Sequence, residues 1–434
     1  MTIRKPIRSV AKPGHRIRVA LAGFGTVGSS VVRVLAQHNF DGIELAYIFN
    51  RGVARKKKSP QAKLVPKSTI WTENIDDVLN SDIDILVELT GGLDPALTWH
   101  RRALAAGKSV VTANKQLIAA HGVELAKLAR ESRAHLLYGA AVAGGIPVIP
   151  GILQGLGGEQ AVRISGILNG TCNFMLSAME AGADYADVLA QAQKLGYAEA
   201  DPTADVDGFD ARAKLTILAR IALHAELDPK AIAVESIRPI SAVDFHYAKE
   251  LGCTIRQVSE AELDGSLVRA RVAPMLVPKS SPLAWSRGTQ NMVVASGQFG
   301  GDVVFSGHGA GGGPTAVAVV SDLLAVAHNS ASVELPVRRR RTTGEFIAPH
   351  YLRFLVNDKP GIVSSISGAL ARVGANIDSL LQQPGYPKNR LPFVITTEPC
   401  ATSVIERATR AMAKLPCMLQ NPLCLQILEM KDKD

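Results

Sequence analysis

The chain has few aromatic residues, few charged residues and no long uninterrupted run of apolar side chains. Aromatic residues make up 5% of its 434 positions and charged residues 20%, whereas hydrophobic residues make up 47%. No apolar run reaches the roughly 20 residues that a membrane-spanning helix needs, so we expect no membrane partner. The length and composition instead favour an α/β protein of two or three domains, rich in alanine and valine.

Cysteine is scarce and irregularly placed. The chain has five cysteines, an odd number, and their spacing fits neither a metal site nor a disulfide framework. Scattered thiols of this kind are typical of a reducing compartment, which predicts a cytoplasmic protein. The five are Cys172, Cys253, Cys400, Cys417 and Cys424.

Acidic residues are missing from the start of the chain, where the first one is Asp41. Residues 1–16 therefore form a basic tail, a composition shared with organelle targeting segments. Pro6 and Pro13 oppose the amphipathic helix of such a segment, and we favour a plain tail. Its basic residues are Arg4, Lys5, Arg8, Lys12 and Arg16.

The net charge of +9 raises the possibility of nucleic-acid binding. Much of the excess lies in the tail and in a second basic run, Arg338–Arg341. That run lies between a proline and a threonine-glycine turn, which is typical of a solvated linker, and we place the linker at 336–349. We expect no nucleic-acid partner.

A dinucleotide-binding motif stands near the N-terminus. A short apolar run, residues 17–22, leads into GFGTVG, and residues 29–36 continue as an apolar helix. A strand, a tight glycine turn and a helix in this order cradle a pyrophosphate at the helix N-terminus. The predicted cofactor-binding residues are Gly23, Phe24, Gly25, Thr26, Val27 and Gly28.

The end of the second strand, expected at residues 44–49, indicates which dinucleotide is bound. NAD sites usually carry an acidic residue there for the ribose hydroxyls, whereas this chain has Arg51 and a basic run at 55–58. The pattern favours NADP, with Arg51 as the phosphate contact.

Two further apolar runs, Ile83–Thr90 and Ser109–Ala113, predict parallel strands. Ligands bind beyond the carboxyl ends of such strands, which places Thr90 and Lys115 at the cofactor.

The stretch Gly196–Lys214 gathers five carboxylates ahead of a lone lysine, which suits a site that binds a cationic group and transfers a proton. Turn signals precede a helical repeat of apolar residues, so Asp210 and Lys214 occupy neighbouring positions, i and i+4, on one helix. An exposed ion pair is the ordinary explanation of that spacing. Because this helix is apolar on nearly all sides, we instead expect Lys214 to be a general acid or base.

Five segments together resemble the homoserine dehydrogenase family. They are GFGTVG, VTANK, GILNGTCNF, LGYAEADPTADVDGFDARAK and GAGGGPT, in this order between residues 17 and 328. The resemblance implies reversible reduction of aspartate 4-semialdehyde to homoserine with a nicotinamide cofactor, in the synthesis of threonine, methionine and isoleucine.

The same resemblance implies roles for individual residues. Lys214 corresponds to the proton donor and Lys115 to its partner at the aldehyde oxygen. The ammonium-binding positions are Glu199 and Asp205, and Asp210 orients the catalytic lysine. Other implied contacts are Gly170 and Thr171 for the substrate carboxylate and Gly309 for the cofactor.

One position departs from the family, whose members commonly carry a glutamate where this chain has Gly139. The loop that follows can hold a monovalent cation in the family, and the matching carbonyls here belong to Val142, Gly144 and Ile146. Without the carboxylate such a site loses its fixed charge, so we do not expect tight metal binding.

The last part of the chain resembles an ACT domain, a β-α-β-β-α-β module that senses amino acids and pairs with another copy. The resemblance implies an amino-acid effector, with threonine the natural candidate, at Asp358, Gly361 and Asn376. A homodimer or homotetramer is expected.

The predicted architecture is a Rossmann domain, an α+β catalytic and dimerisation domain and a ferredoxin-like ACT domain. Two other functions stay open: a dehydrogenase for another amino-acid semialdehyde, and a non-catalytic amino-acid sensor. The predicted boundaries are 1–16 for the tail, 17–150 with 308–335 for the Rossmann domain, 151–307 for the catalytic domain, 336–349 for the linker and 350–430 for the ACT domain.

Overall fold

The computed structural model describes residues 16–38, 40–331 and 336–429. Most of the basic tail, including Arg4, Lys5, Arg8 and Lys12, lies outside these ranges, as do 332–335 and the last residues of the chain. The described chain divides into two compact units. Unit 1 holds residues up to 164 together with 213–229 and 295–339, and unit 2 holds the remainder. The domain boundaries drawn from the sequence remain a prediction.

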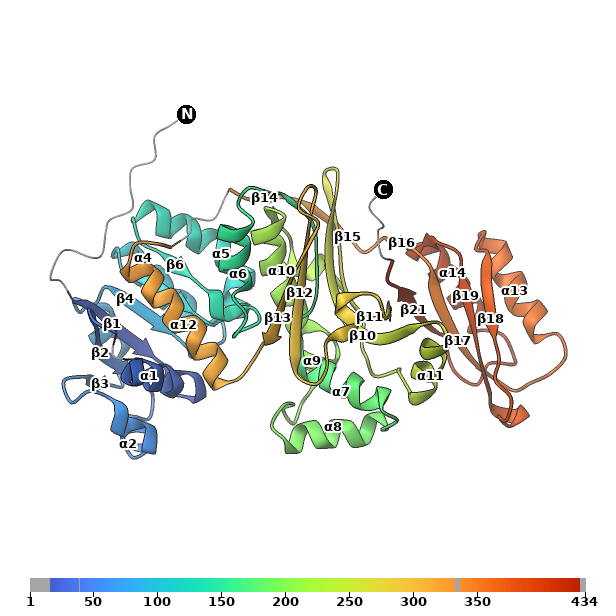
Figure 1. Ribbon diagram of the computed structural model, residues 1–434, viewed down its shortest axis with the longest axis horizontal. Helices are drawn as coiled ribbons and strands as arrows, with labels where there is room; N and C mark the ends of the chain where they lie inside the picture. Colours follow the sequence, from blue (N-terminus) through green and yellow to red (C-terminus); the bar gives the residue numbers. More distant parts are fainter. Residues whose placement is uncertain (1–15, 39, 332–335, 430–434) are drawn as a thin grey trace. The chain divides into compact units, whose positions relative to one another are not determined.

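Unit 1 contains a six-stranded parallel sheet in the order β3-β2-β1-β4-β5-β6, which is the Rossmann order (Figure 1). Helices cover both faces of this sheet, as parallel sheets require, so most residues of its strands are buried. They run Ile17–Ala22, Ile43–Phe49, Ile70–Thr72, Ile85–Glu88, Ser109–Thr112 and Leu136–Leu137.

The helices of unit 1 that bear on the site follow the strand ends. Helix α1 spans Thr26–His38, α4 spans Ala96–Ala105 and α5 spans Lys115–Glu131. Helix α12, Gly312–Ala327, comes from far along the chain and packs against α1, with Val319 and Leu323 in the Rossmann core. Shorter helices are α2 (Val53–Lys57), α3 (Ile75–Leu79) and α6 (Val148–Pro150).

Unit 2 is built on a mixed sheet. Two long antiparallel strands, β10 (Cys253–Asp264) and β11 (Leu267–Pro278), form its middle. Strands β7 (Ala161–Ile167) and β12 (Gln290–Gly297) continue it on one side. The helices of this part are α7 (Gly170–Glu180), α8 (Tyr185–Lys194), α9 (Thr203–Val206) and α11 (Ala242–Glu250).

The ACT module continues the same sheet on the other side, in the order β21-β17-β19-β18 (Figure 1). Strand β21 runs parallel to β11, with Met275 opposite Gln426 and Leu276 opposite Ile427. The elements are β17 (His350–Val356), α13 (Ile362–Val373), β18 (Ile377–Leu381), β19 (Leu391–Thr397), α14 (Thr402–Met412) and β21 (Leu423–Ile427). This confirms the predicted fold class, while the shared sheet was not predicted.

The arginine run that we placed in a solvated linker is partly extended structure. Strand β14, Arg338–Arg339, pairs with β8, Ala225–Glu226, within unit 1. Strand β15, Arg341–Thr343, pairs with β11 within unit 2. Backbone pairing, which side-chain composition does not reveal, anchors these largely exposed residues, and the linker assignment remains a prediction.

Candidate active site

The glycine-rich turn after β1 has the geometry of a dinucleotide-binding loop. Gly23 has a φ of 111°, and a Cβ there would lie 3.0 Å from the Leu89 carbonyl oxygen. A Cβ at Gly28, in the first turn of α1, would overlap the Gly23 carbonyl. Gly25 has open space around it, so protein packing does not require glycine there, whereas the close approach of a ligand does. These residues fit a bound pyrophosphate.

A second glycine-rich turn lies beside the first. Gly312, at the start of α12, approaches α1 so closely that its Cβ would lie 2.8 Å from Ser30 Oγ. Gly309, three residues earlier in the chain, is buried, and its carbonyl lies 3.1 Å from a Cβ built on Gly144. The predicted cofactor residue Gly309 and the predicted cation loop therefore lie side by side in unit 1.

Arg51 lies two residues after the end of β2 and is exposed. The parallel pairing of Ala22 with Phe49 brings the end of β2 next to the glycine turn. Among the described residues, Arg51 makes no ion pair, so its guanidinium is available to a ligand.

A buried carboxylate, Glu88, organises the loops at the ends of β4 and β5. One oxygen accepts hydrogen bonds from the Thr90 hydroxyl and amide at 2.7 Å and from the Gly91 amide at 3.0 Å. The other accepts from the Thr112 hydroxyl at 2.9 Å and from Asn114 Nδ2 at 3.2 Å. The two strand-end loops that carry Thr90 and Lys115 are thus tied to one side chain.

Glu88 also contacts a histidine within unit 1. His100 Nε2, on α4, lies 3.3 Å from its carboxylate, and both side chains are fully buried. Burial favours a high pKa for Glu88, but the contacts with His100 and Thr90 outweigh it and lower the pKa to about 2. Glu88 was missed because Ile83–Thr90 was interpreted as a continuous apolar strand. The signal in the sequence that could have revealed it was a carboxylate inside an otherwise apolar run.

Lys115 is the first residue of α5, and Asn114 caps that helix by accepting the Leu117 amide at 3.2 Å. Lys115 is half-buried at the carboxyl end of the parallel sheet, as predicted. Its side chain belongs to unit 1, as does that of Lys214.

Lys214 lies on α10, Phe209–Ala222, and only 8% of its surface is exposed. The same helix carries Arg220, which is buried and donates to the carbonyls of Ile118 (2.8 Å) and Ala119 (3.2 Å) on α5. A Cβ at Gly122 would overlap this guanidinium, so a glycine is needed there. Arg220 therefore docks the helix of Lys214 onto the helix that begins with Lys115, a link that sequence reasoning missed.

Three of the candidate polar residues come together in unit 2. Asn169 Nδ2 donates to Asp205 at 2.7 Å and to Asp210 at 3.0 Å. Its Oδ1 accepts the Cys172 amide and so caps α7. Asn169 directly precedes Gly170 and Thr171 in the sequence, and it is the residue that joins the two carboxylates.

The other candidates in this region are placed differently. The Thr171 hydroxyl donates to the Tyr197 carbonyl at 2.7 Å. Glu199 is exposed, and its carbonyl accepts a hydrogen bond from Gln193. Of the five carboxylates in the stretch, Asp207 is held by Arg238 at 2.9 Å, and this hydrogen bond lowers its pKa.

A carboxylate also lies beside Gly139, from a residue distant in sequence. Asp322, on α12, accepts the Gly139 amide at 2.8 Å, and a Cβ at Gly139 would lie 2.9 Å from the same carboxylate. Burial raises the pKa of Asp322 to about 7, against the opposing effect of the Gly139 hydrogen bond. A carboxyl group therefore lies near the start of this loop, and it is charged only above about pH 7.

The predicted effector residues lie around the start of α13. Gly361 precedes this helix with a φ of 92°, and the Asp358 amide donates to the Lys388 carbonyl at 2.7 Å. Asn376 Nδ2 donates to Glu398 at 3.1 Å.

Within the described ranges, no three His, Cys, Asp or Glu side chains are grouped as a metal site would require. In the same part of the chain, none of the helices has the length and apolarity that crossing a bilayer demands.

Comparison with known proteins gives one consistent result. Residues 147–324 match the family model of homoserine dehydrogenase, 23–139 that of the homoserine dehydrogenase NAD-binding domain and 350–417 that of the ACT domain. The chain is 37% identical to a homoserine dehydrogenase of Corynebacterium glutamicum over 93% of this chain and 94% of the relative. It is 41% identical to one of Mycobacterium tuberculosis over 85% and 86%.

Solved structures agree. A homoserine dehydrogenase from Thiobacillus denitrificans superimposes with a TM-score of 0.86 at 32% identity, covering 95% of this chain and 98% of that one. A hyperthermophilic archaeal homoserine dehydrogenase in complex with NADPH has a TM-score of 0.62 at 27% identity, covering 74% and 100%.

Proposed function

The chain belongs to the homoserine dehydrogenase family, and on that premise we propose which residues carry the interconversion of aspartate 4-semialdehyde and homoserine, and with which cofactor. The observation that carries the proposal is the docking of α10 on α5 by Arg220, because it holds together the helices of Lys214 and Lys115. The family membership also argues against the two alternatives left open by the sequence, a dehydrogenase for another semialdehyde and a non-catalytic sensor.

Lys214 is the general acid of the reduction, and Lys115 stabilises the same oxygen. A reduced nicotinamide cofactor, when bound, supplies the hydride to the aldehyde carbon. Negative charge then develops on the aldehyde oxygen, and two ammonium groups stabilise it while Lys214 gives up a proton. In the reverse direction Lys214 accepts the hydroxyl proton.

The substrate ammonium is bound by Asp205 and Glu199, while Asp210 orients Lys214 along α10. The support for Asp205 and Asp210 is their shared donor, Asn169, which fixes both carboxylates relative to the start of α7. The first amides of α7, at Gly170 and Thr171, suit the substrate carboxylate because helix N-terminal amides lack partners within the helix.

NADP is the preferred cofactor. Arg51 supports this proposal, since it is exposed, stands at the end of β2 and has no carboxylate partner in the described chain. The pyrophosphate is held by Gly23, Phe24, Gly25, Thr26, Val27 and Gly28, with Thr90, Lys115 and Gly309 nearer the nicotinamide.

A monovalent cation can be held by the carbonyls of Val142, Gly144 and Ile146. The support is Asp322, whose carboxylate lies at Gly139, three residues before Val142. Above about pH 7 it supplies the charge that the loop itself lacks.

The ACT module binds an amino-acid effector, threonine in our proposal, at Asp358, Gly361 and Asn376. The free amides at the start of α13 suit its carboxylate. The protein assembles as a homodimer or homotetramer, through which an effector can shift activity.

The test of this proposal is to measure the homoserine-dependent reduction of NADP and of NAD by the purified protein. We expect turnover with both and a lower KM for NADP. Equal KM values would contradict the cofactor preference, and undiminished turnover of a Lys214→Ala variant would contradict the assignment of the acid.

A further inference from the structure

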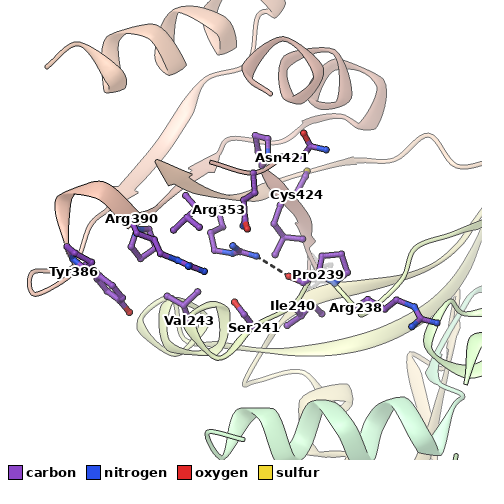
Figure 2. A pocket seen from close by; sticks show the side chains of 16 residues that line it. Arg238, Pro239, Ile240, Ser241, Val243, Arg353, Tyr386, Arg390, Asn421 and Cys424 are labelled. Atoms are coloured by element: carbon purple, nitrogen blue, oxygen red, sulfur yellow. Dashed lines mark hydrogen bonds between the residues drawn. The ribbon is translucent and has the colours of Figure 1, made fainter. Parts of the chain in front are cut away.

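A large pocket lies within unit 2, away from the residues assigned above. Its cavity measures about 750 Å³. One wall is the segment from Arg238 to Val243, which leads into α11, and the other comes from β17 and the loops around β19 and β21 (Figure 2). A volume of this size is in the usual range for small-molecule sites, about 300 to 1,000 Å³.

The charged groups that line the pocket are all positive. They are Arg238, Arg353 and Arg390, and within the described ranges neither aspartate nor glutamate lines it. In Figure 2 the side chains of Arg353 and Arg390 extend from the ACT elements toward the segment that carries Pro239 and Val243.

Arg353 is held rigidly in the pocket wall. Only 5% of its surface is exposed, its Nε donates to Asp244 at 2.6 Å, and its Nη2 donates to the Pro239 carbonyl at 3.0 Å. Asp244 is fully buried and also accepts the Tyr351 hydroxyl and the Ser241 amide. The guanidinium is therefore positioned before any ligand arrives.

The two other arginines differ in their charge balance. Arg238 forms an ion pair with Asp207 at 2.9 Å. Arg390 is exposed and, among the described residues, has no carboxylate partner. The pocket therefore carries one uncompensated positive charge next to a fixed guanidinium, which suits a single anionic group, since arginine binds carboxylates through paired hydrogen bonds.

The remaining lining is largely apolar, with Ile240, Val243, Leu355 and Leu423 among its side chains. Such walls suit a hydrocarbon body and do not suit a bare inorganic anion. The absence of a lining carboxylate leaves a ligand ammonium group without a counter-charge, and desolvating an unpaired ammonium is costly.

We propose that this pocket binds a small organic carboxylate with an apolar body and no ammonium group, such as a branched 2-oxo acid. The site is separate from Asp358, Gly361 and Asn376, which do not line it. Because its walls come from both α11 and the ACT module, an occupant stabilises the junction between them by mass action.

Isothermal titration calorimetry of the full chain with 4-methyl-2-oxopentanoate, L-leucine and inorganic phosphate tests the proposal. We expect the oxo acid to bind with millimolar or lower Kd, the amino acid at least about tenfold more weakly, and phosphate not at all. Saturating homoserine must leave the oxo-acid heat unchanged, which separates this pocket from the active site.

Arg390→Gln should weaken oxo-acid binding by about 10- to 100-fold, since a charged hydrogen bond contributes about 1.5–3 kcal/mol and 1.4 kcal/mol is tenfold. Arg372→Gln, which removes an equally exposed arginine from α13, is the matched control and should bind normally. Three results of the titrations would overturn the proposal: no heat from the oxo acid at about tenfold above millimolar concentration, equal binding of L-leucine, or binding of phosphate alone. Displacement of the oxo acid by homoserine, or equal effects of the two variants, would overturn it as well.

Discussion

Replacing Asp322 with asparagine measures what the buried carboxylate beside Gly139 does to the stability of unit 1. The raised pKa means that the folded chain keeps a proton on Asp322 up to about pH 7, whereas the unfolded chain releases it near the ordinary aspartate pKa of 3.8. Between these values the folded state binds more protons, so stability falls as pH rises. The loss is complete above pH 7.

The magnitude follows from the size of the shift. A change from 3.8 to about 7 corresponds to about 4 kcal/mol at alkaline pH, at about 1.4 kcal/mol per pH unit. This is an upper limit, because Asp322 is half-buried and lines a cavity of about 50 Å³, which has room for water that solvates the charge. Asparagine keeps the acceptor for the Gly139 amide and removes the charge.

We therefore expect Asp322→Asn to raise the Tm of unit 1 at pH 8 by about 5 to 10 °C, at about 2–4 °C per kcal/mol, and to leave it unchanged near pH 4. Differential scanning calorimetry between pH 4 and 8 gives the comparison. Asp302→Asn, at an exposed position of the same unit, is the control and should do nothing. A wild-type Tm that stays flat across this range would refute the reasoning.

The same scan tests the cation. If a monovalent ion balances Asp322, potassium chloride at pH 8 should raise the wild-type Tm more than tetramethylammonium chloride does. The difference should disappear in Asp322→Asn. Equal responses to the two salts would count against a cation at this loop.

The other predictions concern catalysis, cofactor choice and regulation. Lys214→Ala should lower kcat at least about a hundredfold with unchanged dinucleotide affinity, measured by steady-state kinetics and fluorescence titration; turnover near wild type would remove the general acid. Arg51→Ala should weaken NADP by about 1.5–3 kcal/mol and NAD hardly at all, and equal losses would contradict the phosphate contact. Glu88→Gln should destabilise the fold by about 3 kcal/mol at pH 7. Because the Glu88 pKa is lowered, that difference should shrink as pH falls from 4.5 toward 2, and a pH-independent difference would argue against it. Threonine should inhibit the full chain, and Asn376→Ala should weaken this inhibition at unchanged basal activity; inhibition of both proteins alike would place the effector elsewhere.

Much of the fold could be predicted because its signals are local. The turn at Gly23–Gly28 and the apolar strands around it are recognisable within short windows. The same holds for Lys115, which lies three residues after the end of its strand.

The parts that were missed depend on contacts between distant residues. Asn169 meets Asp205 across 36 positions, and Asp322 meets Gly139 across 183. No periodicity or turn signal encodes such a pairing. Glu88 is a different case, because its position within an apolar strand can be read from the sequence. Burying an unpaired carboxylate is costly, so that position already indicates that Glu88 needs partners.

The parallel pairing of β21 with β11 limits how this protein can be taken apart or rebuilt. Cutting the chain after Arg341 would leave β11 without its neighbour at Met275 and Leu276, and would leave buried Asp244 without Tyr351 and Arg353. An exposed strand edge invites pairing with other chains, so we expect the shortened protein to aggregate. A different sensor grafted at this point would have to bring its own strand for β11, so the sensory module of this protein cannot be exchanged as a separate cassette.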